Sequence, residues 1–178
     1  MTFSNPAGSA AALAGTYVKA LLDLLGDRDP LSVQAELVPA LEALTAGLDE
    51  KSWRRPESAG KWSIVEVVQH LADSEIVIGY RIRLILSQDR PPIQGFDQDA
   101  WARHLGYAAA DPETALGQLR AVRVANLALL RTLDAARLDR YGVHSERGPE
   151  SVRRIAQLTA AHDLVHRRQI ERVRSSAD

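Results

Sequence analysis

The chain has 178 residues, of which 46% are hydrophobic, and its 22 lysines and arginines are balanced by 23 aspartates and glutamates. This length suits one domain, so we expect a single domain over residues 1–178. The formal net charge is −1, so the chain has no excess of basic residues of the kind that nucleic-acid binding requires. No nucleic-acid partner is therefore expected. The chain has no cysteine, which excludes disulfides, thiolate-bound zinc, iron–sulfur clusters and a cysteine nucleophile. Any metal ion must therefore be held by histidine or carboxylate side chains.

The sequence also indicates where the protein works. No stretch reaches the roughly 18–20 apolar residues that a membrane helix needs, so no membrane partner is expected. No basic residue precedes Lys19, so the N-terminal region lacks the charged start of a secretory signal. We therefore expect a cytoplasmic protein.

Apolar residues recur at helical spacing through nearly the whole chain. In the first part, this pattern predicts a short helix over residues 9–25 and a second helix over residues 31–48. Pro39 lies inside the second helix, where a kink is expected. Residues 53–60 contain proline and glycine and are predicted to form a loop.

The clearest helix boundary is at Ser63. Ser63 and Glu66 have the spacing of a capping box, in which each residue satisfies a backbone amide of the first turn. The helix is predicted to extend to residue 87, because two prolines follow soon afterwards. The long connection over residues 89–111 is predicted to contain a short helix.

Two further helices complete the predicted elements. Pro112 suits the first turn of a helix whose apolar stripe extends to Leu133. Residues 141–149 are predicted to form a loop, and the last long helix is predicted to begin near Ser151 and to end near residue 173.

These elements predict the fold class. No segment shows the alternating pattern of a strand, so we expect an all-α protein. Residues 31–174 are predicted to form the core of a four-helix bundle, and residues 1–30 an N-terminal extension with a short helix.

The most informative residues are His162 and His166 on the last helix. Residues four apart lie on one helix face about 6 Å apart, close enough for both imidazoles to bind one ion. Both histidines share the inward stripe of apolar residues. This spacing also occurs by chance, so two hydrogen-bonded bundle histidines are the alternative interpretation.

His70 favours the metal interpretation. It lies on the apolar stripe of the helix that begins at Ser63, where an antiparallel helix can meet it. Three histidines directed into one bundle from two helices are better explained by a shared ion than by three separate accidents. Neutral imidazoles suit zinc, nickel or iron, and three protein ligands leave positions for water or substrate.

Three segments give the sequence a family resemblance. They are residues 60–75 (GKWSIVEVVQHLADSE), 97–101 (DQDAW) and 162–170 (HDLVHRRQI). Together they resemble the DinB superfamily, which includes metal-dependent hydrolases and thiol S-transferases of the bacillithiol and mycothiol kind. The resemblance extends over almost the whole chain.

The resemblance implies a homodimeric four-helix bundle with a divalent ion bound by His70, His162 and His166. Zinc, nickel, manganese and iron are all compatible with it. Many members carry a further histidine directly before the last ligand, where this chain has Val165. That difference removes one polar group near the site but none of the three ligands.

Other polar residues are weaker candidates. Glu66 could act as a base, but its role in the capping box with Ser63 already explains why a glutamate is at this position. Asp73 and Asp163 could orient an imidazole, although solvated charges are the simpler interpretation. Arg120 and Arg123 lie near an apolar stripe and are candidates for binding an anionic substrate. An internal ion pair or an extended surface side chain is the alternative for both.

Two histidines lie outside the predicted ligand set. His144 is in the predicted loop before the last helix, where the family often has a histidine. The resemblance implies a substrate-binding residue at the rim of a pocket, while a surface histidine is the interpretation that we prefer slightly. His104 is expected to be exposed.

Two classes of function follow. The first is an enzyme whose ion activates either water, as in a hydrolase, or a low-molecular-weight thiol, as in an S-transferase acting on a small-molecule substrate. The alternative is a bundle that binds a metal or ligand in a stress response without catalysis. A role in DNA repair has no support in the charge balance.

Overall fold

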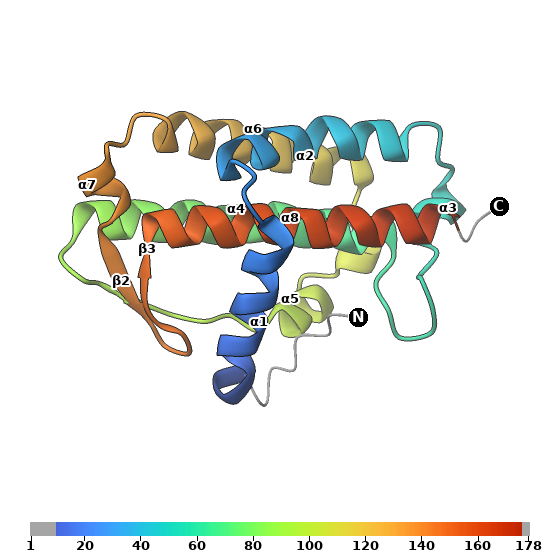
Figure 1. The fold of residues 1–178 in the computed structure, drawn as a ribbon. Helices are drawn as coiled ribbons and strands as arrows, with labels where there is room; N and C mark the ends of the chain where they lie inside the picture. Colours follow the sequence, from blue (N-terminus) through green and yellow to red (C-terminus); the bar gives the residue numbers. More distant parts are fainter. Residues whose placement is uncertain (1–9, 176–178) are drawn as a thin grey trace.

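The structure is a computed structural model that describes residues 10–175, with side chains from residue 15 onward. Four long helices pack together in a bundle (Figure 1). They are α2 (Pro30–Thr45), α4 (Ile64–Ser87), α6 (Pro112–Leu130) and α8 (Val152–Ser175). Each of α4 and α2 packs against both α6 and α8. The predicted all-α bundle is therefore confirmed as the main architecture.

A further helix, α1 (Ala10–Leu25), crosses the outer side of α8 near its middle (Figure 1). Leu21 and Leu25 of α1 pack there against Ala160 and Ala161 of α8. The helix matches the predicted range of 9–25 almost to the residue. Residues 1–9 of the predicted N-terminal extension lie outside the part of the chain that the structure describes.

Two larger apolar clusters hold the bundle together. One joins all four bundle helices and includes Leu41, Val68, Leu119 and Val173. The other lies at the opposite end and includes Ile85, Ile93, Leu130 and Val152. Burial of these side chains is the main favourable contribution to folding.

The predicted helix boundaries are largely confirmed by their caps. At Ser63, the backbone N–H donates to Glu66 Oε2 at 2.8 Å and Oγ accepts from the Glu66 backbone N–H, as the capping box requires, and Oγ also donates to Glu66 Oε2 at 2.7 Å. Pro112 occupies the first turn of α6. Pro39 lies inside α2, which ends at Thr45, three residues earlier than predicted.

Short elements lie in the connections. The short helix predicted within 89–111 is α5 (Gln98–His104), and a 3-10 turn, η1 (Tyr107–Ala109), follows it. Two short helices were not predicted: α3 (Glu50–Arg54), which covers the start of the predicted loop, and α7 (Ala135–Leu138). None of the helices within residues 10–175 is long and apolar enough to cross a membrane.

The prediction that the chain has no strands is wrong. The predicted loop at 141–149 is a hairpin of antiparallel strands β2 (Tyr141–His144) and β3 (Gly148–Ser151), and β1 (Pro92–Ile93) pairs parallel to β2. Strands of two to four residues are too short for alternation to be visible, and they contain glycine and proline, which are depleted in strands. Gly142 is needed there, because a Cβ at this position would lie 2.8 Å from the Pro91 carbonyl oxygen.

Candidate metal centre

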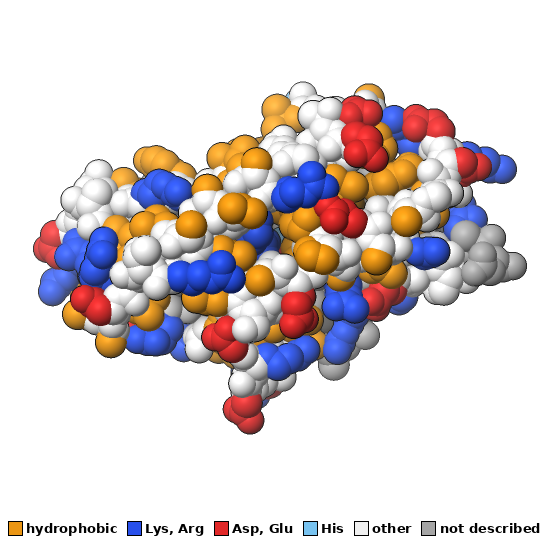
Figure 2. Space-filling view, turned by 90° about the horizontal axis from the view of Figure 1, so that it is seen from above, with side chains coloured by type: hydrophobic (Ala, Val, Ile, Leu, Met, Phe, Trp, Pro, Cys, Tyr) orange, Lys and Arg blue, Asp and Glu red, His pale blue; other side chains and the backbone are white. Residues whose placement is uncertain are grey.

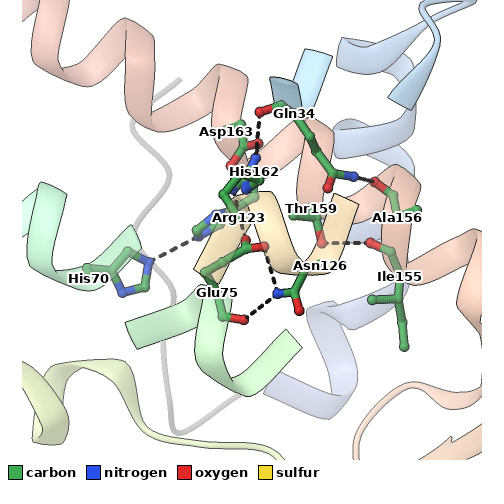
Figure 3. A network of polar contacts seen from close by, with 10 residues as sticks. All are labelled: Gln34, His70, Glu75, Arg123, Asn126, Ile155, Ala156, Thr159, His162 and Asp163. Atoms are coloured by element: carbon green, nitrogen blue, oxygen red, sulfur yellow. Dashed lines mark hydrogen bonds and ion pairs between the residues drawn. The ribbon is translucent and has the colours of Figure 1, made fainter. Parts of the chain in front are cut away.

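Three histidines converge between α4 and α8. His70 Nε2 lies 3.0 Å from His162 Nε2, which lies 3.1 Å from His166 Nε2. His162 and His166 are one turn apart on α8, and the packing of α4 against α8 brings His70 opposite them. Figure 3 shows the imidazoles of His70 and His162 pointing toward each other. The structure thus brings together all three histidines that the sequence analysis selected, with their ligand atoms within 4.8 Å of one another.

The spacing of these nitrogens fits a shared cation. Zinc–nitrogen bonds of about 2.0–2.1 Å in a tetrahedral site place two ligand nitrogens about 3.3–3.4 Å apart, close to the observed contacts. Hydrogen bonds cannot account for both contacts, because Nε2 of a neutral imidazole has either one proton or one lone pair. His162 Nε2 can therefore form a hydrogen bond in one contact only, whereas a central cation attracts all three lone pairs.

Burial keeps the three imidazoles neutral. It lowers the pKa of His70 and His162 well below the usual value of 6.5, and the neighbouring His166 adds to the effect at both. Burial also lowers the pKa of His166 to about 4, although its bond to Gln169 opposes the shift. At neutral pH each imidazole is neutral and has one unprotonated nitrogen, as metal ligation requires.

Gln169 orients one of these ligands. Its Oε1 lies 2.9 Å from His166 Nδ1, so Nδ1–H donates to the amide and Nε2 is left with its lone pair facing the cluster. The sequence analysis did not select Gln169, although its position three residues after His166 on one helix was the available signal. His70 Nδ1 is buried and has no hydrogen-bond partner within the described residues, and the Trp62 ring lies 4.9 Å from the His70 ring.

An ion-pair network lies next to the histidines (Figure 3). The Arg123 guanidinium is 3.0 Å from Asp163 Oδ1 and 2.9 Å from Glu75 Oε2, and all three side chains are buried. Asn126 Nδ2 donates to Glu75 Oε1 at 2.8 Å. Burial raises the pKa of Asp163 to about 6, and Arg123 opposes this rise. Arg123 is therefore engaged in an internal ion pair, and its predicted role in substrate binding is not supported.

Arg120 is also engaged elsewhere. Its Nε donates to Glu42 Oε1 at 2.9 Å across α6 and α2, and the pair is exposed. On the face formed by these two helices, acidic and basic side chains are interspersed (Figure 2). Arg120 lines neither of the two cavities that meet at the histidines, and its exposed pair with Glu42 agrees with the alternative of a surface side chain.

The predicted carboxylate candidates make contacts of their own. The Glu66 carboxylate accepts the bonds of the Ser63 cap. Asp73 Oδ2 accepts from the Tyr107 hydroxyl at 2.6 Å, and Oδ1 accepts from Gln118 at 2.8 Å. The expectation of solvated charges is thus wrong for Asp73 and for the buried Asp163. Neither makes a hydrogen bond to the three histidines.

The preferred interpretation of His144 as a surface residue is wrong. It lies on β2, is only 2% exposed, and lines the same cavity as His70 and His162. Its burial follows from the pairing of β2 with β1 and β3, which the sequence pattern did not predict. His104 is exposed at the end of α5, as predicted.

Two cavities meet at the histidines. The first, which we call the sheet-side cavity, has a volume of about 150 Å³ and is lined by His70 and His162, by His144 of β2, and by Arg81 and Phe96. The second, the larger cavity, has about 640 Å³ and is lined by residues that include His162, His166 and Gln169. His162, Tyr17 of α1 and Gln98 line both cavities.

Comparisons with known proteins agree with this geometry. Residues 36–170 match the family model of the DinB superfamily. The chain is 32% identical over 114 residues to "Putative metal-dependent hydrolase YfiT" of Bacillus subtilis, covering 64% of this chain and 62% of that protein. A relative from Geobacillus thermodenitrificans with the same "Putative metal-dependent hydrolase" name is 31% identical over 59% of each chain. The alignments thus span about three fifths of the length of these relatives.

Solved structures give a longer match. The structure of Bacillus subtilis YfiT, described as "a probable metal-dependent hydrolase with an unusual four-helix bundle topology", superposes with a TM-score of 0.78. It is 26% identical, and the match covers 83% of this chain and 85% of that one. The resemblance drawn from the three sequence segments is confirmed: the chain belongs to the DinB superfamily and shares the bundle topology of YfiT.

Proposed function

We propose that this protein is a divalent-metal-dependent hydrolase of small molecules, with His70, His162 and His166 as its metal ligands. The observation that carries the proposal is the convergence of three Nε2 atoms, with His162 Nε2 at 3.0 Å from His70 Nε2 and 3.1 Å from His166 Nε2, in a site that keeps all three imidazoles neutral. The names of the relatives support the same class of function.

The chain's own residues prepare this site in three ways. Burial keeps the histidines unprotonated, Gln169 fixes the orientation of His166, and the two cavities give small molecules access to His162 from two directions. Zinc, nickel or ferrous iron suits three imidazoles, and manganese is included in the test. A bound ion of this kind supplies a Lewis acid that lowers the pKa of water or of a thiol.

S-transfer from a low-molecular-weight thiol is the second candidate. It uses the same three ligands, and because the chain has no cysteine, the sulfur must come from a separate molecule. The specific observation in its favour is the larger cavity of about 640 Å³ beside His162 and His166, which has room for a thiol cofactor in addition to a substrate in the sheet-side cavity.

The first experiment measures metal content by mass spectrometry in protein purified without an affinity tag. We expect nearly one ion per chain in the parent protein and its loss in His70→Ala and in His166→Ala. The exposed His104→Ala is the matched control and should retain the ion. A parent protein that is metal-free and cannot be loaded with zinc, nickel, manganese or iron would overturn the proposal.

A second experiment separates catalysis from binding alone. The cobalt-loaded protein should change its visible spectrum when azide or a small thiol is added, because three protein ligands leave room for a further one. Hydrolysis of ester and amide substrates is then compared with thiol-dependent conversion of electrophiles. A cobalt spectrum that responds to no added molecule would favour a binding protein without catalysis.

A further inference from the structure

Arg81 is a buried cation without a carboxylate partner. It lies on α4, is 9% exposed, and lines the sheet-side cavity. Its Nη2 donates to the Gln94 carbonyl oxygen at 2.6 Å, and its guanidinium carbon lies 5.8 Å from the centre of the Phe96 ring. Among residues 15–175, no carboxylate oxygen lies within 4.0 Å of it. Buried charges are normally paired, so this guanidinium is available to pair with an anion.

The contrast with Arg123 shows that this arrangement is unusual within the same molecule. Arg123 is also buried, with 3% of its surface exposed against 9% for Arg81, but it contacts both Asp163 and Glu75. At Arg81, burial lowers the pKa to about 10 and the neighbouring charge of Arg147 adds to this effect, whereas the charges of Glu150 and Glu146 oppose it. The guanidinium remains charged at neutral pH, and its charge is not neutralised by a direct contact.

His144 places a hydrogen-bond donor on the same cavity wall. Burial, followed by the charges of Arg147 and Arg81, lowers its pKa to about 4, so the imidazole is neutral at pH 7. Its Nδ1 accepts a hydrogen bond from the Glu146 backbone N–H at 3.1 Å, so the proton of the neutral ring is on Nε2. This Nε2 is buried without a partner in the part of the chain that the structure describes. It is a donor that lacks an acceptor.

The other charges on this wall do not neutralise Arg81 directly. Arg147 forms two bonds to Glu150, at 2.7 and 2.9 Å, so these two charges compensate each other. The Glu146 side chain is exposed to solvent and lies beyond ion-pair distance from Arg81. Arg81 therefore has no carboxylate in direct contact, although Glu146 and Glu150 line the same cavity.

We propose that the sheet-side cavity binds a small organic monocarboxylate, whose carboxylate contacts Arg81 and the His144 Nε2–H and whose other end faces His70 and His162. A guanidinium matches a carboxylate through two parallel N–H donors. A single guanidinium without a contacting carboxylate matches a single negative charge better than a phosphate dianion, because Glu146 and Glu150 line the same cavity and would repel a second negative charge. A cavity of about 150 Å³ is the size that encloses a benzene molecule, so the ligand has roughly six non-hydrogen atoms.

This inference deepens the proposed function by naming the class of substrate, and its role in catalysis rests on that function. The binding step does not, because Arg81 and His144 belong to the chain whether or not an ion is present. Apolar side chains also line the cavity, namely those of Ile78, Ile155 and Leu158. They suit an aliphatic body between the carboxylate and the histidines.

The test compares butyrate with butyramide, which has the same shape but no charge. Binding to the full chain is measured by ligand-detected NMR at pH 7.5, both as purified and after treatment with a chelator. We expect butyrate to bind about tenfold or more tightly than butyramide in both preparations. Arg81→Met should remove this preference, Arg81→Lys should retain part of it, and the exposed Arg103→Met should leave it unchanged.

Several outcomes would overturn the inference. These are equal binding of the two probes by the parent protein, a preference for butyrate that survives in Arg81→Met, and an Arg81-dependent affinity for inorganic phosphate that exceeds the affinity for butyrate. If Arg81→Met does not fold, as judged by circular dichroism, His144→Phe decides instead. It should weaken butyrate binding several-fold and leave butyramide binding unchanged, and equal effects on both probes would contradict the proposal.

The two proposals fail in distinguishable ways. Butyrate binding that depends on Arg81 in a protein without His-dependent metal would support the anion site and overturn the metal site. Stoichiometric metal in a protein without a preference for butyrate would give the reverse result.

Discussion

The two ends of the sheet-side cavity offer opposite chemistry. At one end, two long helices present the lone pairs of neutral imidazoles from His70 and His162, which attract a cation. At the other end, Arg81 and His144 present N–H groups, which attract an anion. The helical end is held by packing between α4 and α8, whereas the sheet end is assembled from short strands and loops around one helical residue. The cavity is therefore polarised, and a bound molecule has a preferred direction.

The largest expected effect is at the helical end, where His162 is the central ligand. Its Nε2 contacts both other imidazoles, so His162→Ala should remove nearly all bound metal and the metal-dependent activity. Metal content and activity are measured together, with His104→Ala as the control. Retention of a full complement of metal in His162→Ala would show that the ion binds elsewhere.

The second prediction compares how substitution of each of the two buried arginines, Arg123 and Arg81, changes the free energy of unfolding. Arg123→Met leaves Asp163 and Glu75 buried without their cation and should lower the free energy of unfolding by about 3–5 kcal/mol. Arg81→Met removes a charge that lacks a carboxylate partner and should change this free energy by less than about 1 kcal/mol. Denaturant unfolding measures both.

Arg120→Met is the matched control for Arg123→Met. It breaks only the exposed pair with Glu42 and should cost at most about 1 kcal/mol. Equal destabilisation by Arg81→Met and Arg123→Met would mean that Arg81 has a structural partner that compensates its charge, and the contrast between the two arginines would be lost.

The third effect is a pH dependence at the sheet end. The folded protein keeps His144 neutral down to a pKa of about 4, whereas the unfolded chain binds a proton near the usual value of 6.5. Between these values the unfolded state binds more protons, so His144 makes the folded protein less stable as the pH falls from about 6.5 to 4. The parent should therefore lose about 2 kcal/mol more than His144→Gln between pH 7 and pH 4.5. Denaturant unfolding at the two pH values measures this, and parallel losses would indicate that His144 is not held neutral.

The smallest expected effect is at Gln169, which contacts a ligand but does not bind the ion. Gln169→Leu removes the acceptor for His166 Nδ1–H and should weaken metal affinity about tenfold, the lower end of the range for such supporting bonds. Competition with a chromophoric chelator measures the affinity, and Gln157→Leu on the same helix is the control. An unchanged affinity would show that helix packing alone orients His166.

The helical end was predictable because its signals are local. A spacing of four residues places His162 and His166 on one face, and the Ser63 cap fixes the phase of the helix that carries His70. The pairing of these helices then follows from their apolar stripes. The metal-ligand role itself remains a proposal.

The sheet end was not predictable because its contacts join distant segments. In the sequence, Arg81 looks like a surface residue of a helix. Its burial depends on the segment around Gln94, thirteen residues later. His144 is buried by a strand pairing that two to four residues cannot signal. Arg120 and Arg123 are three residues apart on one helix. The buried one is distinguished by Glu75 and Asp163, which lie on other helices, forty or more residues away in the chain.

The position of Tyr17 and His162, which line both cavities, has a kinetic consequence. If two reactants reached His162 through the two separate cavities, neither would occupy the other's cavity. A reaction between a small carboxylate and a second molecule would then follow a random order of addition, with no compulsory first substrate. Initial-rate patterns would be symmetrical in the two reactants, and each would retain its affinity for the protein in the absence of the other.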